Sequence, residues 1–280
     1  MYGVLIEWLG DDLKKVDLKD GVTEEETVQA MTTLARLHAA WWNTEEEDAL
    51  SALFKPEESL QMILGFMGGA ELASEYAATT FKEAFGDKFA SYVAAGVRTM
   101  PSWAFKGCTG DRNRTLCTWD LRTENMVWRR TPGGPDDYEC VILDHQVWCY
   151  GGAPMFDVAV FFGCSCAEET MAERVEVGLR AYHSTLTSLG VATYSEAEMH
   201  ADFNRACWHA CSFPCFGGKM VKETQAKADA AAPGSAEQQE ALQMVQNMVA
   251  LFNDMARRTK KLVDLRDAYS GAPFHVPGYT

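Results

Sequence analysis

Three side chains in the middle of the chain have the types and the spacing that phosphoryl transfer requires. Asp120 and Asn125 stand five residues apart in Cys117-Thr-Trp-Asp-Leu-Arg-Thr-Glu-Asn, and Asp144 ends the segment Cys140-Val-Ile-Leu-Asp. Mg²⁺ prefers oxygen ligands and takes only one or two of them from the protein when substrate phosphates supply others. We therefore expect Asn125 and Asp144 to hold Mg²⁺, and Asp120 to orient a substrate hydroxyl and accept its proton. The alternative is a polar hairpin without a catalytic role, because Asp and Asn are common turn residues.

A β-hairpin is the element that must bring these residues together. The sequence predicts one strand over Asn125 to Arg129 and another over Tyr138 to Leu143, joined by Thr131-Pro-Gly-Gly-Pro-Asp-Asp, which has the residues that turns need. Antiparallel pairing places the start of the first strand beside the end of the second. Asn125 and Asp144 should then be neighbours, with Asp120 facing the same space.

Helices are predicted for most of the remaining chain, so the expected fold class is α+β and mainly α. The clearest helix begins at Thr23, which forms a capping box with Glu26, and its apolar face carries Met31, Ala35 and His38. The residues from Arg114 to Ala159 are expected to be rich in strands and loops. Further helices are predicted over residues 59–67, 71–85, 167–190, 196–211, 219–232 and 235–265, with Gly68, Gly69, Gly86 and Gly96 as breaks.

Composition limits the possible functions. The chain has 280 residues with 25 basic and 40 acidic side chains, a formal charge of −15, and 47% of its residues are hydrophobic. This excludes extensive disorder and argues against a nucleic-acid partner, which requires a basic face. The sequence shows neither a signal peptide nor an apolar run long enough for a membrane span, and its nine cysteines suit a reduced set of thiols. We therefore expect a cytoplasmic protein.

The segment from Thr118 to Asn125 resembles the H-x-D-x-x-x-x-N catalytic loop of the kinase-like fold, and Asp144 resembles its metal-binding Asp. The most similar group is the aminoglycoside phosphotransferase and choline kinase-like family, including its ecdysteroid kinase-like branch. The similarity covers roughly residues 1–215. Three further segments match in the family's order: Leu34-Ala-Arg-Leu-His-Ala-Ala-Trp-Trp, Gly151-Gly-Ala-Pro-Met-Phe-Asp157 and Arg180-Ala-Tyr-His-Ser.

This resemblance implies the C-terminal lobe of a protein-kinase-like fold that uses ATP and Mg²⁺ to phosphorylate a hydroxyl of a small molecule. It implies that Asp157 braces the catalytic loop by accepting backbone N–H bonds. Residues 1–10 would be the last N-lobe strand and the hinge, where Glu7 and Leu9 contact the nucleotide, residues 11–232 the C-lobe, and residues 233–280 a C-terminal helix and tail. Arg122 could contact the transferred phosphate, or it could form a surface salt bridge with Glu124 or Asp111.

Two departures from the family pattern leave an alternative open. Thr118-Trp119 stands where the family has His-Gly, and the glycine-rich loop and lysine of an N-lobe are not in this sequence. We therefore also consider a pseudokinase-like binding module, or a kinase fragment whose missing N-lobe or a partner covers the leading strand.

Other clusters have simpler explanations. Cys207, Cys211 and Cys215, with His200 and His209 nearby, could bind zinc, but a stripe of thiols on a helix is more commonly part of a core. Four tryptophans could form a box that binds a cationic group, but tryptophans on helix faces are also more commonly part of a core. They are Trp41, Trp42, Trp148 and Trp208.

Overall fold

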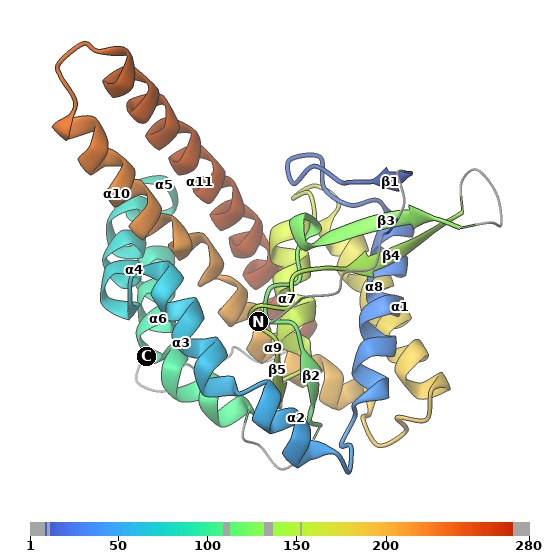
Figure 1. Cartoon of the computed structure of the whole chain (residues 1–280). Helices are drawn as coiled ribbons and strands as arrows, with labels where there is room; N and C mark the ends of the chain where they lie inside the picture. The colour runs from blue at the N-terminus through green and yellow to red at the C-terminus, as the bar shows by residue number, and fades with distance from the viewer. Residues whose placement is uncertain (1–8, 10–11, 109–112, 132–136, 152, 271–280) are drawn as a thin grey trace, which may run out of the picture.

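A computed structural model of the chain describes residues 9, 12–108, 113–131, 137–151 and 153–270. Within them the fold is mainly helical with small antiparallel sheets, which is the α+β class expected from the sequence (Figure 1). The predicted leading strand lies outside the described residues except for Leu9, which is partly buried and is not in a strand. None of the described helices is both long enough and apolar enough to cross a membrane.

The helices follow one another along most of the chain. In chain order they are α1 (Glu24–Ala40), α2 (Glu47–Leu53), α3 (Pro56–Met67), α4 (Ala70–Tyr76), the π-helix η1 (Ala77–Phe81), α5 (Lys82–Phe85), α6 (Asp87–Cys108), the 3-10 helix η2 (Thr123–Asn125), α7 (Met155–Ser165), α8 (Met171–Ser188), α9 (Glu196–Ala210), the 3-10 helix η3 (Phe213–Phe216), α10 (Gly217–Ala230) and α11 (Ala236–Ser270).

The strands form two small sheets. They are β1 (Leu13–Lys14), β2 (Thr115–Cys117), β3 (Met126–Arg130), β4 (Tyr138–Ile142) and β5 (Cys149–Gly151). The first sheet has the order β1-β3-β4 and the second pairs β2 with β5, all antiparallel. The loop between β2 and β3 therefore connects the two sheets, and it contains Asp120.

The predicted hairpin is confirmed, with its strands shifted by one residue at the ends. Met126 pairs with Ile142 and Arg130 pairs with Tyr138, while Thr131 N donates to Asp137 O at 2.8 Å to close the turn. One face of the hairpin carries Met126, Trp128 and Cys140 and packs into the core against α1, because side chains alternate between the two faces of a strand.

The helix α1 also forms as the sequence predicts. Thr23 is its N-cap, and the capping box is complete, with Glu26 N donating to Thr23 Oγ1 at 3.2 Å and Thr23 N donating to Glu26 Oε2 at 2.8 Å. Met31, Ala35 and His38 are fully buried against α8 and the hairpin. The helix thereby buries His38 near its end, besides the polar residues Glu26 and Thr27 of its first turn.

Two clusters of buried side chains make up the core, and α7 lies between them. One cluster joins α3, α4, α6 and α11, and the other joins α1, α8 and α9. All eleven residues of α7 are buried, which is why its sequence is almost entirely apolar except for Asp157. A buried carboxylate in such a helix requires hydrogen-bond partners.

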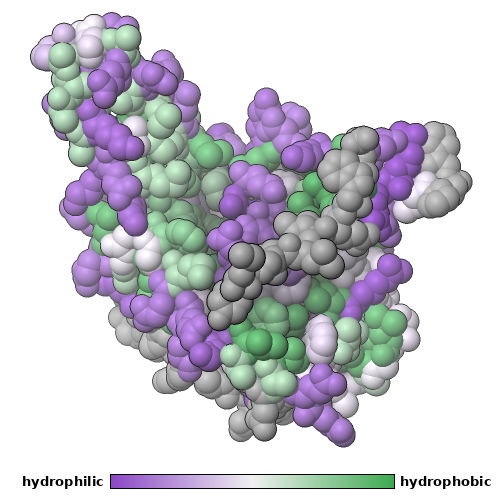
Figure 2. Space-filling model, in the orientation of Figure 1, coloured by the Kyte–Doolittle hydropathy of each residue, from purple (hydrophilic) through white to green (hydrophobic). Residues whose placement is uncertain are grey.

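The helices α10 and α11 form an antiparallel pair that extends from the body of the molecule, while the hairpin lies on the other side (Figure 1). Green and purple surfaces alternate along this arm in Figure 2, because apolar side chains are exposed among polar ones. The exposed apolar residues of the arm are Met220, Leu242, Met244 and Leu251.

Three details of the predicted elements are wrong. Gly96 does not end a helix but lies buried inside α6, since a single glycine costs a helix only about 1 kcal/mol. The strand- and loop-rich segment ends before residue 155, where α7 begins, and the helix predicted over 71–85 contains a π-helical turn. The helix predicted from residue 235 forms as α11, and Ser235 caps it by accepting from Gln238 N at 3.2 Å.

Candidate functional site

Asp120 lies in the loop between β2 and β3, and its carboxylate is held by two neighbours. Arg122 Nε donates to Asp120 Oδ1 at 2.8 Å, and Asn125 Nδ2 donates to Asp120 Oδ2 at 2.8 Å and to the Asp120 carbonyl oxygen at 2.9 Å. The Asp120 side chain is 25% exposed, so it is fixed in direction and still accessible from solvent. Such a carboxylate can accept a proton from a group brought to it.

Asn125 connects this loop to the hairpin. The carbonyl oxygen and Oδ2 of Asp120 both accept from the Asn125 amide nitrogen, so the Asn125 amide oxygen must point away from Asp120. The Asn125 carbonyl oxygen accepts from Leu143 N at 2.8 Å, which places Asn125 beside the segment that carries Asp144. The hairpin thus brings the start of β3 and the residues after β4 together, as the sequence predicts.

Asp144 follows β4 with a left-handed backbone, φ 55°, and its side chain is exposed. Gln146 N donates to Asp144 Oδ1 at 3.2 Å, which is the local bond of an Asx-turn. One carboxylate oxygen of Asp144 is therefore used in the turn, while the exposed carboxylate can still meet a ligand from outside.

Burial raises the pKa of the Asp120 carboxyl above its usual value. The Arg122 guanidinium and the Asn125 amide oppose this change because they favour the charged form, and the negative charge of Asp144 adds to it. Asp144 therefore lies close enough to Asp120 for its charge to act on that carboxyl. A cation bound between them would relieve their mutual repulsion.

Arg122 forms the surface salt bridge considered from the sequence. Besides Asp120, its guanidinium pairs with Glu124, and the Arg122 and Glu124 side chains are 28% and 46% exposed. Asp111, the other expected partner, lies outside the described residues. Contact of Arg122 with a phosphate stays a prediction.

Asp157, in the first turn of α7, lies behind the loop and holds its backbone. Its Oδ2 accepts from Thr118 N and its Oδ1 accepts from Trp119 N, both at 2.7 Å. These are the contacts that the expected bracing role requires. Two successive N–H groups can converge on one carboxylate where the backbone passes through a left-handed conformation, and Trp119 has φ 57°.

Trp119 occupies an unusual backbone position for a bulky residue. Left-handed geometry costs a residue other than glycine about 1–3 kcal/mol. The Trp119 ring is 1% exposed and stacks on Phe156, with ring centroids 5.4 Å apart and planes at 28°. Burying an aromatic side chain contributes about 4–6 kcal/mol at about 25 cal/mol per Å², so packing offsets the cost of the backbone.

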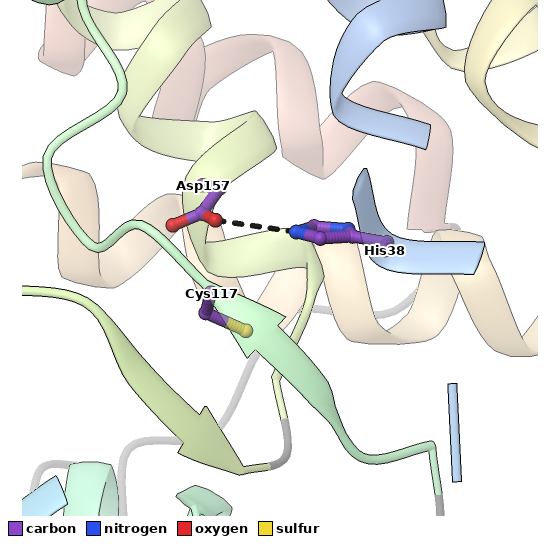
Figure 3. Close-up of side chains that lie close together, drawn as sticks. All are labelled: His38, Cys117 and Asp157. Atoms are coloured by element: carbon purple, nitrogen blue, oxygen red, sulfur yellow. Dashed lines mark hydrogen bonds and ion pairs between the residues drawn. The ribbon is translucent and has the colours of Figure 1, made fainter. Parts of the chain in front are cut away.

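A buried hydrogen-bond chain continues from Asp157 to two residues that sequence reasoning did not select as site residues. His38 Nε2 lies 3.3 Å from Asp157 Oδ2 (Figure 3). On the other side of the ring, His38 Nδ1 lies 2.6 Å from the Tyr182 hydroxyl. Because Asp157 can only accept, the consistent tautomer carries the proton on Nε2, and Nδ1 then accepts from Tyr182. The signal in the sequence was a single histidine on the apolar face of α1.

His38, Cys117 and Asp157 are also close enough to be considered as metal ligands. One ligand atom of each lies within 4.8 Å of the others, and all three residues are fully buried. However, both oxygens of Asp157 already accept backbone N–H bonds, and His38 is bonded at both nitrogens. We therefore assign the group a structural role in holding the loop.

The other candidates are core residues or remain predictions. Leu9 is partly buried, and Glu7 lies outside the described residues, so the predicted nucleotide contacts stay predictions. Among the described residues, Cys207, Cys211 and Cys215 are not part of any potential metal group, and burial makes them core residues. The Trp148 ring packs against His145 at 4.1 Å, and the Trp42 ring packs against Tyr194 at 5.1 Å.

Comparison with known proteins identifies one family. The model of the ecdysteroid kinase-like family matches residues 10–192, which include Asp120, Asn125, Asp144 and Asp157. No curated protein matches the chain.

Proposed function

The chain belongs to the ecdysteroid kinase-like family, and on this premise we propose that it transfers the γ-phosphate of ATP to a hydroxyl of a small molecule with the help of a divalent metal. The family indicates a small-molecule phosphotransferase of the kinase-like group. The observation that supports metal-dependent transfer from ATP is that Asp120, Asn125 and Asp144 lie close together at one end of the hairpin.

The donor set fits a hard divalent cation such as Mg²⁺. The Asn125 amide is oriented by Asp120 so that its oxygen is turned away from that carboxylate, and Asp144 presents an exposed carboxylate close by. Oxygen ligands of this kind and number suit Mg²⁺ in sites where phosphates complete the coordination. When bound, the metal would neutralise charge on the phosphates of ATP.

Asp120 is the residue we propose as the base. It would hold the acceptor hydroxyl through its carboxylate and take up the hydroxyl proton as the phosphoryl group is transferred. Arg122 and Asn125 fix the direction of the carboxylate, and Asp157 fixes the backbone before it. We further propose that residues 11–232 correspond to a kinase-like C-lobe and that the adenine lies toward Glu7 and Leu9.

The test compares loss of the Asp120 charge with loss of an exposed charge on another element. ADP release would be followed with Mg-ATP and a panel of hydroxyl compounds, including sterols, amino-alcohols and aminoglycosides. Asp120→Asn should lower kcat by about 10²–10⁴-fold, because a general base is lost. Glu176→Gln removes an exposed charge from α8, where Glu176 pairs with Arg180, and should leave kcat within about threefold.

Binding measurements separate the base from the metal ligands. In calorimetric titration, Asp144→Asn should weaken Mg-ATP binding, whereas Asp120→Asn should leave it largely intact. Equal activity in Asp120→Asn and the parent protein would refute the assigned base. An absence of Mg-ATP binding by the parent chain would contradict the proposed cofactor.

A further inference from the structure

Trp119 is the residue of the loop whose backbone and side chain make opposite demands. Its φ of 57° lies in the region that favours glycine, yet it carries the largest side chain. Its indole Nε1 is buried without a hydrogen-bond partner, and its ring is 1% exposed. A bulky residue keeps such a conformation only when its surroundings hold it there, and such outliers gather at functional sites.

Two contacts hold residue 119, and both lead to the start of α7. The Trp119 ring stacks on Phe156 at 5.4 Å, and the Trp119 amide donates to Asp157 at 2.7 Å. Side chain and amide are attached to the same Cα, so rotating φ to a negative value would move one of them relative to the other. The stack and the hydrogen bond can therefore both persist only near the observed φ.

Asp120 is the next residue, so its direction depends on this attachment. We infer that Trp119 is a positioning residue: the stack of its indole on Phe156 keeps the loop in its left-handed conformation and thereby fixes Asp120 in front of Asn125. The catalytic reading of this inference rests on the proposed function, but the conformational reading does not.

The competing explanation is that Trp119 only fills the core. Trp128 in β3 provides the matched control, because it is fully buried and its Nε1 also lacks a partner. It differs from Trp119 in lying within a strand and outside the loop. Loss of core volume alone should therefore affect both tryptophans in the same way.

The variants separate stacking from burial. Trp119→Phe keeps a flat ring that can stack on Phe156, whereas Trp119→Leu keeps apolar volume without a stack. Phe156→Leu removes the stack from the other side. If the stack positions the loop, Trp119→Leu and Phe156→Leu should have the same effect, and the double variant should add little to either.

The first measurement is amide-resolved hydrogen exchange of residues 115–125 in the whole chain. Trp119→Leu should raise the exchange rates of the amides at 118 and 119 by about tenfold relative to the parent, and Trp119→Phe should raise them by less than about threefold. Trp128→Phe and Trp128→Leu should not change the exchange rates of these two amides beyond the change that global unfolding produces in all protected amides. Parental protection in Trp119→Leu, or equal loss in both Trp128→Leu and Trp119→Leu, would overturn the inference.

The second measurement is steady-state kinetics with Mg-ATP. Trp119→Leu should lower kcat by about 10–10²-fold with the KM for ATP within about twofold, because a displaced base impairs the reaction more than the binding. Trp119→Phe should restore kcat. If the parent chain neither binds nor turns over Mg-ATP, the proposed function fails, while the exchange result still decides whether the stack holds the loop.

Discussion

Asp157→Asn is the substitution that most directly tests how the loop before Asp120 is held. The two side chains have nearly the same shape, so the change leaves no cavity. The carboxylate accepts two backbone N–H bonds of 2.7 Å, one on each oxygen, and lies 3.3 Å from His38. The amide has one oxygen, so its NH₂ group must face either the Thr118 N–H or the Trp119 N–H.

The expected cost follows from these contacts. A hydrogen bond to a charged acceptor contributes about 1.5–3 kcal/mol, and a buried donor left without an acceptor costs a further 1–3 kcal/mol or so. We therefore expect the free energy of unfolding to fall by about 3–5 kcal/mol. With an unfolding entropy of about 2.1 cal/mol/K per residue over 280 residues, this corresponds to a decrease in Tm of roughly 5–9 °C.

The assay is urea unfolding followed by circular dichroism, with calorimetry for the Tm. Asp264→Asn is the matched control, because Asp264 also pairs with one basic partner, Lys260, but its side chain is 58% exposed. The control should change the free energy of unfolding by less than about 0.5 kcal/mol. A loss below about 1 kcal/mol in Asp157→Asn would refute the view that Asp157 holds the loop as a charged acceptor.

Three further predictions concern the packing of the fold and its buried thiols. Gly217→Ala should destabilise the chain by about 1–3 kcal/mol in urea unfolding, because a Cβ there would lie 2.3 Å from the Phe252 ring. Gly65→Ala in α3 is the control, because a Cβ at Gly65 meets nothing within 4 Å. Equal unfolding midpoints of the parent and Gly217→Ala would contradict this packing. Arg258→Met should lower the free energy of unfolding in urea by about 3 kcal/mol, because the buried guanidinium donates to the carbonyls of Leu18 and Lys19 and pairs with Asp254 at 2.9 Å. Arg257→Met is the control and should be near neutral, because the Arg257 side chain is exposed. Burial raises the pKa of the Cys140 and Cys164 thiols to about 12, so the folded state holds these protons more tightly than the unfolded chain. The contribution of these thiols to the free energy of unfolding should be fully present below about pH 9 and should fall between pH 9 and 12, by up to about 1.4 kcal/mol per pH unit for each thiol. A urea midpoint that does not change between pH 8 and pH 10 would contradict this.

Local sequence signals predicted the elements that carry the site. The capping box of Thr23 and Glu26 starts α1, and the turn residues between Arg130 and Tyr138 produce the hairpin, because both effects depend on a few neighbouring residues. Antiparallel pairing then required Asn125 to lie beside the end of β4. The family resemblance supplied the expected roles of Asp120, Asn125, Asp144 and Asp157. The match of the family model to residues 10–192 confirms the family.

The sequence by itself determined many of the helices, the hairpin and the residues that could hold a phosphate-bound metal, since these follow from periodicity, turn chemistry and side-chain type. Only the tertiary structure decided that His38 and Tyr182 extend the hydrogen bonds of Asp157, because His38 in α1 and Tyr182 in α8 are 144 positions apart in the chain. It also decided that Trp119 adopts a glycine-like backbone against Phe156. Such contacts arise from how α1, α7 and α8 pack around the loop, and no local pattern encodes that packing.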